Sequence, residues 1–407
     1  MSFDPPLSSS LSPSRGEGDN RLPDHRVPNG EGSEWLPDDY HYMARALALA
    51  RRGLYSTDPN PRVGCVLVKD GHIVGEGWHE RAGEPHAEAI ALDIAGARAR
   101  GATAYVTLEP CCHHGRTPPC TDALLSAGVA RMVAAMRDPN PQVAGRGLDI
   151  LRAAGVWVEC GLLEAEARAL NPGFIQRMTL GRPWVRVKLA MSLDGRTALA
   201  SGESQWLTGE AARADVQRLR ARSSAILTGA GTVLADDPSL NVRLPEAVCQ
   251  PLRVILDTEL RTRPTARTLQ LPGPVAIFTT VLDPAVWAPL QAAGGEIVVA
   301  PRAGRGLDLR VVMAELARRE CNEVHVECGP TLAGALLQAE LIDELVIYLA
   351  PLLLGDRARG LFHLPELVRM RERQELEILE TRAVGRDWRL TLRPSEYRIA
   401  IPNLDPR

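Results

Sequence analysis

The chain has 407 residues, 45% hydrophobic and 24% charged, a composition typical of globular proteins and a length that favours two domains, with three possible. Its formal net charge is -3 and it has no long Lys/Arg run, which argues against nucleic-acid or polyanion binding and favours small substrates. No apolar run reaches the roughly 18 residues of a membrane span, and the N-terminus lacks an export signal, so we expect a cytoplasmic protein.

The first half of the chain predicts a disordered tail followed by a mixed α/β domain. Residues 1–35 are rich in Ser, Pro, Gly, Asp and Arg and have few large apolar side chains to offset the entropy of ordering. A helix is expected to begin at Asp38 or Asp39 as the N-cap. The following pattern predicts strands at 63–68 and 72–78 joined by a hairpin, a helix at 87–98, a strand at 103–108, a helix at 121–127 and a strand at 131–135.

The second half predicts another strand-and-helix series with its own core. Strands are expected at 185–190, 225–228, 253–256, 275–279, 296–299 and 323–327. Between the two series, 162–170 has a helical pattern and Asn171-Pro172-Gly173 interrupts it. We therefore predict one domain over 36–180 and a second over 181–400.

A cluster of potential metal ligands lies in the first domain. His86, Cys111 and Cys120 supply one imidazole and two thiolates, which suits a catalytic zinc that keeps its fourth position open. Glu88 follows His86 by two residues at a helix start, so it can reach a reacting water and move protons without ligating the metal. Eight cysteines in a chain without an export signal favour metal or reactive thiols over disulfides.

Two other interpretations of these residues remain open. A His-x-Glu alone is more often a core histidine beside buried small cysteines, but the two Pro-Cys pairs favour a metal site. A closed structural zinc site would need a fourth protein ligand, for which Cys112, His113 or His114 are available.

The spacing of the cysteines departs from the plain deaminase signature. Eight residues separate Cys111 from Cys120, whereas that signature has two. The whole string 107–120, together with 60–64, 83–88 and 138–147, resembles the deaminase half of the bifunctional deaminase–reductase family of riboflavin biosynthesis. The resemblance implies that His86, Cys111 and Cys120 hold zinc and that Glu88 is the proton shuttle. It also implies that Asn60, His79, His113 and Arg116 contact the substrate, Arg116 through its phosphate.

The second domain resembles the reductase half of the same family. Its segments 187–196, 201–206, 229–238 and 326–332 match in order, although Lys188, Trp206 or the glycines of 229–231 would be weak indicators alone. The resemblance assigns NADPH binding to Ala190, Trp206, Thr232, Asp236, Thr258, Gly329, Pro330, Thr331, Leu332, Ala333, Gly334 and Ala335. It assigns substrate binding to Lys188, Ser204, Arg220, Leu240, Arg243 and Glu327. A strand, turn and helix at 324–335 would suit a phosphate through the free N–H groups of the helix.

The resemblance covers about residues 38 to 400 and implies both fold and reaction. The expected fold is α/β: an N-terminal cytidine-deaminase-like three-layer α/β/α domain followed by a dihydrofolate-reductase-like α/β domain. The expected activity is zinc-dependent hydrolytic deamination of 2,5-diamino-6-(5-phosphoribosylamino)pyrimidin-4-one, then NADPH-dependent reduction of the ribosyl side chain to ribityl. A homo-oligomer without nucleic-acid or membrane partners is also expected. The alternatives are a nucleic-acid base deaminase with a degenerate second domain and a non-catalytic zinc-stabilised binding module.

Overall fold

The computed structural model describes residues 35–113, 118–245 and 249–395. The predicted tail at 1–35 lies almost entirely outside these residues. The first helix, α1 (Pro37–Ala50), begins before both aspartates, so the predicted N-cap at Asp38 or Asp39 is wrong. Proline is tolerated in the first helical turn because its missing N–H has no intrahelical partner there. Asp39 is instead buried and accepts a hydrogen bond from the Tyr105 hydroxyl at 2.6 Å.

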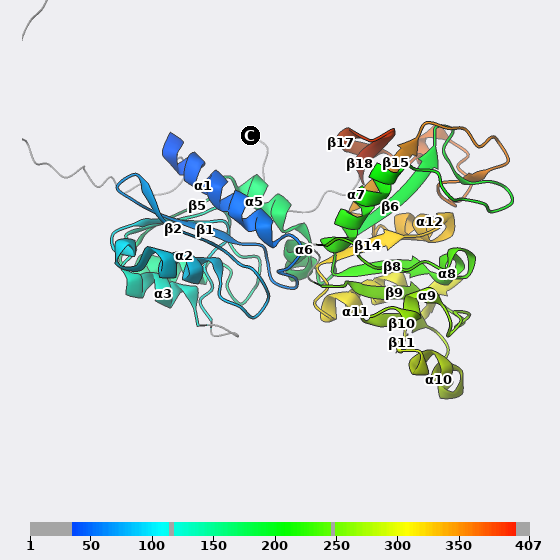
Figure 1. Ribbon diagram of the computed structural model, residues 1–407, viewed down its shortest axis with the longest axis horizontal. Helices are drawn as coiled ribbons and strands as arrows, with labels where there is room; N and C mark the ends of the chain where they lie inside the picture. Colours follow the sequence, from blue (N-terminus) through cyan, green and yellow to red (C-terminus); the bar gives the residue numbers. More distant parts are fainter. Residues whose placement is uncertain (1–34, 114–117, 246–248, 396–407) are drawn as a thin grey trace, which may run out of the picture. The chain divides into compact units, whose positions relative to one another are not determined.

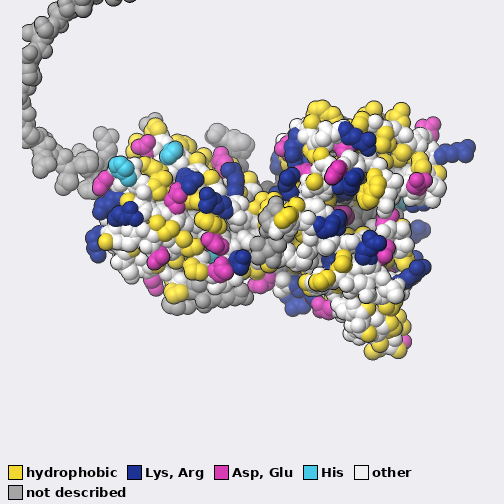
Figure 2. Space-filling model, viewed as in Figure 1, with side chains coloured by type: hydrophobic (Ala, Val, Ile, Leu, Met, Phe, Trp, Pro, Cys, Tyr) yellow, Lys and Arg dark blue, Asp and Glu magenta, His cyan; other side chains and the backbone are white. Residues whose placement is uncertain are grey.

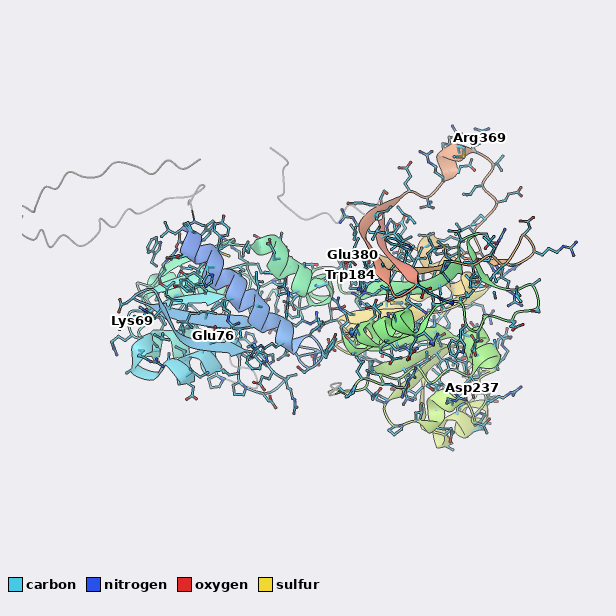
Figure 3. The ribbon with its side chains drawn as sticks, turned by 45° about the horizontal axis from the view of Figure 1, so that its top comes forward. Lys69, Glu76, Trp184, Asp237, Arg369 and Glu380 are labelled. Carbon is cyan, nitrogen blue, oxygen red and sulfur yellow. The ribbon has the colours of Figure 1, made fainter. Side chains whose placement is uncertain are left out.

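The first sheet has five strands in the order β2-β1-β3-β4-β5. Their bounds are β1 Gly64–Lys69, β2 His72–Trp78, β3 Thr103–Val106, β4 Arg131–Ala134 and β5 Trp157–Cys160. The predicted hairpin is confirmed: β1 and β2 are antiparallel, and Asp70 and Gly71 between them both have positive φ. Figure 3 labels Lys69 and Glu76 on these two strands. The remaining strands, β3 to β5, are parallel.

Helices cover both faces of this sheet and make three layers (Figure 1). One face carries α1 and α5 (Glu164–Leu170), and the other carries α2 (Ala87–Ala95), α3 (Cys120–Ala127) and α4 (Arg146–Ala153). The predicted helix at 87–98 ends early, because Gly96 has a φ of 53° and a 3-10 turn, Gly96–Ala99, takes over. A shorter 3-10 turn, Arg51–Gly53, follows α1.

Glycine brings α2 into direct contact with β2. A Cβ on Gly75 would lie 2.2 Å from the carbonyl oxygen of Ala91, and one on Gly77 would lie 2.3 Å from that of Ala87. Both distances are shorter than any real Cβ contact. The backbone of α2 therefore rests on the backbone of β2, with no side chain between them.

A helix that the sequence did not predict connects the two sheets. Asn171-Pro172-Gly173 ends α5 as expected, but Pro172 then begins α6 (Pro172–Leu180). Proline at the first helical position is compatible with a helix start, so the interruption separates two helices. This helix packs against β6 and β14 of the second sheet.

The second sheet has nine strands in the order β11-β10-β9-β8-β14-β6-β15-β18-β17. Their bounds are β6 Trp184–Ser192, β8 Ala225–Gly229, β9 Leu252–Leu256, β10 Val275–Thr279, β11 Gly295–Val299, β14 Glu323–Glu327, β15 Glu344–Ala350, β17 Leu376–Val384 and β18 Asp387–Pro394. All are parallel except β17 and β18, which form an antiparallel edge. Short pairs outside it are β7 Arg196–Ala198 with β16 Arg359–Gly360, and β12 Arg302–Ala303 with β13 Gly306–Leu307.

Alternating side chains of the second sheet bury two cores. On β15, Leu345 and Ile347 join the core under α11 (Leu309–Arg318) and α12 (Pro330–Gln338). Val346 and Tyr348 point to the other face, under α7 (Glu210–Ala221). Over β9 and β10 this second face is covered by α8 (Ala230–Asp236), α9 (Arg267–Gln270) and α10 (Pro284–Ala292). A 3-10 turn, Met370–Glu372, precedes β17. Among the helices of the described ranges, none is both long and apolar enough to cross a membrane.

Candidate active sites

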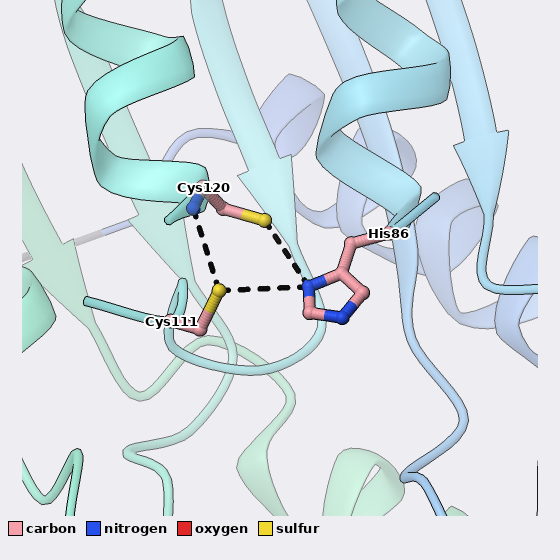
Figure 4. Close-up of side chains that lie close together, drawn as sticks. All are labelled: His86, Cys111 and Cys120. Atoms are coloured by element: carbon pink, nitrogen blue, oxygen red, sulfur yellow. Dashed lines mark hydrogen bonds between the residues drawn. The ribbon is translucent and has the colours of Figure 1, made fainter. Parts of the chain in front are cut away.

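Three side chains from separate elements meet at the start of two helices (Figure 4). His86 precedes α2, Cys120 is the first residue of α3, and Cys111 lies in the loop after β3. The Nδ1 atom of His86 lies 3.3 Å from the Cys120 sulfur and 3.5 Å from the Cys111 sulfur. The backbone N–H of Cys120 also donates to the Cys111 sulfur at 3.3 Å. One nitrogen and two sulfurs thus face a common point.

This arrangement fits a zinc ion. The three ligand atoms lie within 4.8 Å of one another. A tetrahedral zinc with bonds of 2.0–2.3 Å would separate its ligand atoms by about 3.5 Å, close to the two nitrogen–sulfur distances. Across the described ranges no fourth His, Cys, Asp or Glu joins the group, so Cys112 and His113 are not part of it. His114, the third candidate, lies outside the described residues.

Glu88 lies beside this cluster on the first turn of α2. Its side chain is buried, and burial raises its pKa to about 7. The hydrogen bond with Cys120 and the adjacent His86 imidazole hold the pKa of Cys111 well below its usual range. A carboxyl that can gain or lose a proton near neutral pH therefore stands beside a ligand that favours the thiolate.

A cavity of about 330 Å³ opens over His86, Glu88 and Cys111. The predicted substrate residues Asn60, His79 and His113 line it. The Asn60 side-chain nitrogen lies 3.0 Å from Nε2 of His79, whose Nδ1 lies 3.1 Å from the carbonyl oxygen of Pro85. The fourth predicted residue, Arg116, lies outside the described residues.

Sequence reasoning missed other residues of the cavity wall. Asp138 and Asn140 line it, and they belong to the segment 138–147, which carried a family resemblance but was assigned no role. Arg177 of α6 and Glu320 also line it, although Glu320 belongs to the second domain. The local sequence does not distinguish an arginine of a connecting helix that lines a cavity from one whose charge is exposed to solvent.

A buried carboxylate holds the loop on which Asp138 and Asn140 lie. Glu109 accepts hydrogen bonds from the backbone N–H groups of Asp138, Gly145, Gly147 and Leu148 at 2.8–3.4 Å. A carboxylate that accepts several N–H groups is a strong local anchor. The Glu-Pro that follows β3 thus connects the Cys111 loop to the part of the cavity wall that carries Asp138 and Asn140.

The predicted cofactor residues of the second domain lie where parallel strands end. Ala190 is on β6, Thr232 and Asp236 are on α8 after β8, Thr258 follows β9, and Gly329 follows β14. A Cβ on Gly229 would lie 3.6 Å from the Leu332 side chain, so the turns after β8 and β14 are neighbours. Ligands of open α/β sheets bind at this carboxyl edge. Figure 3 labels Asp237, which ends α8.

The predicted substrate residues of this domain form a charged cluster. The Glu327 carboxylate accepts hydrogen bonds from Nε and Nη2 of Arg220 at 2.6 and 2.9 Å. Lys188 lies close enough for Glu327 and Arg220 to influence its pKa, which burial lowers. Arg220 Nη1 donates to the Asn241 carbonyl oxygen, and Arg243 Nη1 donates to the Asn241 side-chain oxygen at 2.8 Å. Four of the predicted residues are therefore linked.

Other predicted residues are less closely linked to this cluster. The Trp206 side chain is 70% exposed and stacks with Arg213 at 4.9 Å, while Leu240 is buried. Ser204 lies in the loop just before Trp206. Within the turn at 329–335, Ala333 and Gly334 are buried, and a Cβ on Gly334 would lie 2.0 Å from the carbonyl oxygen of His363. These two positions therefore also serve packing.

Two family models match the chain in turn. The cytidine and deoxycytidylate deaminase zinc-binding region matches residues 37–136, and the RibD C-terminal domain matches residues 183–390. The chain is 54% identical to the riboflavin biosynthesis protein RibD of Escherichia coli over 361 residues, covering 86% of this chain and 97% of that protein. It is 49% identical to RibD of Haemophilus influenzae, covering 89% and 99%.

The chain belongs to the RibD family.

Solved structures agree with the RibD assignment. RibD of Acinetobacter baumannii superposes with a TM-score of 0.83 at 47% identity, covering 88% of this chain and 99% of that one. A Thermotoga maritima protein described as a diaminohydroxyphosphoribosylaminopyrimidine deaminase and 5-amino-6-(5-phosphoribosylamino)uracil reductase gives 0.78 at 34%, with coverage of 88% and 99%.

The RibD assignment confirms the predicted fold class, a deaminase-like domain followed by a reductase domain. The chain is a bifunctional deaminase and reductase whose cofactors are Zn2+ and NADPH. The alternatives of a nucleic-acid base deaminase and of a non-catalytic zinc module are not favoured.

Proposed function

We propose that this chain deaminates 2,5-diamino-6-(5-phosphoribosylamino)pyrimidin-4-one and then reduces the ribosyl group of the product to ribityl. The description of the Thermotoga maritima relative supports this pair of reactions. The observation that carries the proposal is the three-ligand cluster, with Glu88 beside it, at the base of a cavity.

In the deaminase site we assign His86, Cys111 and Cys120 as zinc ligands. Zinc bound there supplies Lewis acidity toward the attacking water. Glu88 takes the proton from that water and returns it to the departing ammonia, a role that its position and its pKa near 7 support.

The cavity wall binds the substrate. Asn60 and His79, which lie within hydrogen-bonding distance of each other, read polar atoms of the pyrimidine together with His113. Arg116 contacts the substrate phosphate.

In the reductase site we assign Lys188, Ser204, Arg220, Leu240, Arg243 and Glu327 to the substrate. NADPH supplies the reducing equivalents there, and we assign its binding to Ala190, Trp206, Thr232, Asp236, Thr258 and the turn Gly329 to Ala335. The Glu327–Arg220 pair, with Lys188 close by, supports a polar substrate site at the carboxyl edge of the sheet. Arg220 and Arg243 supply positive charge for the substrate phosphate.

We further propose domain limits of 36–180 and 181–400. The end of α6 at Leu180 and the start of β6 at Trp184 support this boundary. Figure 3 labels Trp184, where the second sheet begins. A cytoplasmic location is proposed as well, in keeping with small phosphorylated substrates.

A homo-oligomer is proposed through the edge strand β17. Ile378 is 61% exposed and Leu379 48% exposed on this strand, which has a neighbour on one side only. Apolar side chains gather where β17 lies (Figure 2). An uncovered apolar edge strand favours pairing with a second copy. Ile378→Glu should lower the mass measured by light scattering, whereas an unchanged mass would reject this edge as the interface.

Two assays on the full chain test the proposed reactions. Ammonia release from the diaminopyrimidine substrate should occur without NADPH, and NADPH oxidation should occur only after deamination. Ammonia release without subsequent NADPH oxidation would remove the reductase assignment. NADPH oxidation with the undeaminated substrate would reverse the proposed order.

A further inference from the structure

The helix α6 is docked tightly on the reductase half of the chain. A Cβ on Gly173 would lie 2.4 Å from the carbonyl oxygen of Asn322, so the first turn of α6 contacts this backbone directly. Gln176 is buried, and its side-chain nitrogen donates to the Pro183 carbonyl and the Asp343 carboxylate, both at 2.8 Å. The position of this helix is therefore fixed along one face.

Arg177 is one turn beyond Gly173 and lines the deaminase cavity. Its Nε donates to the side-chain oxygen of Asn322 at 2.7 Å, and its Nη2 donates to the Pro59 carbonyl at 3.4 Å. Asn322 in turn donates to the Asp58 carboxylate at 2.9 Å and to Pro59 at 2.8 Å. A reductase-half amide thus orients both Arg177 and the loop that leads to Asn60.

The contacts of Arg177 leave its charge uncompensated. Both acceptors are neutral oxygens, and no carboxylate within the described ranges forms an ion pair with it. A guanidinium has five N–H donors, so several remain for a ligand. By contrast Arg62, which lies near Pro59 in the sequence, pairs with the buried Glu323 at 2.8 Å.

The charge of the cavity gives this arginine a particular role. Among the described lining residues, Arg177 is the single Lys or Arg, whereas Glu84, Glu88, Glu109, Asp138 and Glu320 carry carboxyl groups. An anionic group would be repelled by such a wall unless a cation faced it. The substrate proposed above carries a phosphate, for which a guanidinium is a favoured partner.

We propose that Arg177 is a specificity-determining residue of the deaminase site that binds the substrate phosphate together with Arg116, and that Asn322 is the positioning residue of Arg177. The assignment rests on the proposed substrate. It makes the turn at 320–322 of the reductase half a part of the deaminase site.

The test is ammonia release by Arg177→Met with the phosphorylated substrate and with its dephosphorylated analogue. Loss of a charge-assisted contact should raise KM for the phosphorylated substrate about 10- to 100-fold. We expect KM for the analogue to change less than about 3-fold and kcat to stay within about 3-fold, because the contact forms equally in ground and transition states. Inorganic phosphate should inhibit the parent enzyme competitively and the variant more weakly.

Controls separate this role from folding and from the proposed reaction itself. Arg168→Met removes an arginine that pairs with Glu164 and is not among the described residues lining the cavity, so KM should stay unchanged for both the phosphorylated substrate and its analogue. Arg177→Lys should recover part of the KM, and Asn322→Ala should raise KM for the phosphorylated substrate less than Arg177→Met does.

An equal rise of KM for both substrates, or no rise for either, would overturn the assignment even in a stable variant. Failure of the parent enzyme to release ammonia would instead reject the proposed substrate.

Discussion

The two active sites of this chain are assembled in different ways. The deaminase ligands lie between His86 and Cys120, at two helix starts and one loop. The reductase residues extend from Lys188 to Ala335 and meet because parallel strands end at one edge. The first site is set by local spacing and by the chemistry of a metal, whereas the second is set by sheet order. We therefore expect a single substitution to abolish activity at the deaminase site, and to lower activity only in part at the reductase site.

The largest effect is expected from Cys111→Ser. Loss of one of three ligands should remove zinc and abolish ammonia release, while NADPH-dependent reduction of the deaminated substrate continues. Metal analysis after dialysis and separate assays of the two steps measure this contrast.

The matched control is the adjacent Cys112→Ser, since Cys112 is not in the ligand group. It should keep stoichiometric zinc and activity. Zinc loss from Cys112→Ser would revive the closed four-ligand site.

Glu88→Gln should have the next largest effect. Glutamine keeps the size of the side chain but cannot move a proton, so kcat for ammonia release should fall about 10²- to 10⁴-fold with zinc retained. Glu84→Gln, an exposed position on the same cavity, should change kcat little. More than a small percentage of residual activity in Glu88→Gln would exclude the shuttle role.

Glu323→Gln tests whether the two halves depend on one another. Glu323 is buried among Arg62, Arg186 and Arg222 at 2.8, 3.0 and 3.1 Å, and Arg62 belongs to the deaminase half. Removing its charge should lower the free energy of unfolding at pH 7 by about 3–5 kcal/mol, because Arg62 and Arg222 lose their carboxylate partner and Arg186 keeps only Glu344. Glu164→Gln, which breaks an exposed pair, should cost less than about 1 kcal/mol. Denaturant unfolding measures both.

The charge of Glu323 also makes the stability difference between the parent protein and Glu323→Gln depend on pH. Burial acts to raise the pKa of Glu323, but the three arginines outweigh it and hold the pKa well below the usual range. Its stabilisation is therefore complete above the unfolded pKa of about 4.3 and is lost as the pH falls through the depressed value. The stability difference between the parent protein and Glu323→Gln should shrink below about pH 4. A difference that stayed constant down to pH 3 would show that the charge is not its origin.

The smallest effect is expected at the reductase site from Arg243→Ala. Arg243 donates to the Asn241 side chain and has no carboxylate partner among the described residues. The reductase KM for the phosphorylated substrate should rise about 10-fold, with the NADPH dissociation constant nearly unchanged. Arg318→Ala, which removes an exposed arginine paired with Glu315, should leave KM unchanged. Equal changes for phosphorylated and dephosphorylated substrates would remove Arg243 from the phosphate site.

The sequence predicted most strands to within one or two residues, because their apolar runs are continuous and bounded by turn residues. It missed α6, since Pro172 and Gly173 look like a break while the structure uses the proline as a helix start and the glycine as a contact. It also missed β5, β15 and the β17–β18 edge. Nearly all of β17 is exposed, so its apolar and charged residues do not alternate as they do on a strand with one buried face.

The functional sites likewise contain residues that the sequence could predict and residues that it could not. His86, Cys111 and Cys120 could be chosen from spacing and metal chemistry alone, and the structure brings them together. Arg177 and Glu320 could not, because they reach the cavity only through the docking of α6 and of the turn before β14. A contact between residues so far apart in sequence leaves no periodic or local signal.

The close contact of α2 with β2 also determines where His86 lies relative to the other two metal ligands. Gly77 lies under Ala87, the residue after His86, and a Cβ there would need the helix to withdraw by roughly 1 Å to reach ordinary contact. Such a withdrawal would carry His86 away from Cys111 and Cys120, which are held by other elements. A methyl group on a strand that supplies no ligand would thus weaken affinity for the ion, so the tolerance of this protein to zinc-poor conditions depends in part on the absence of a side chain.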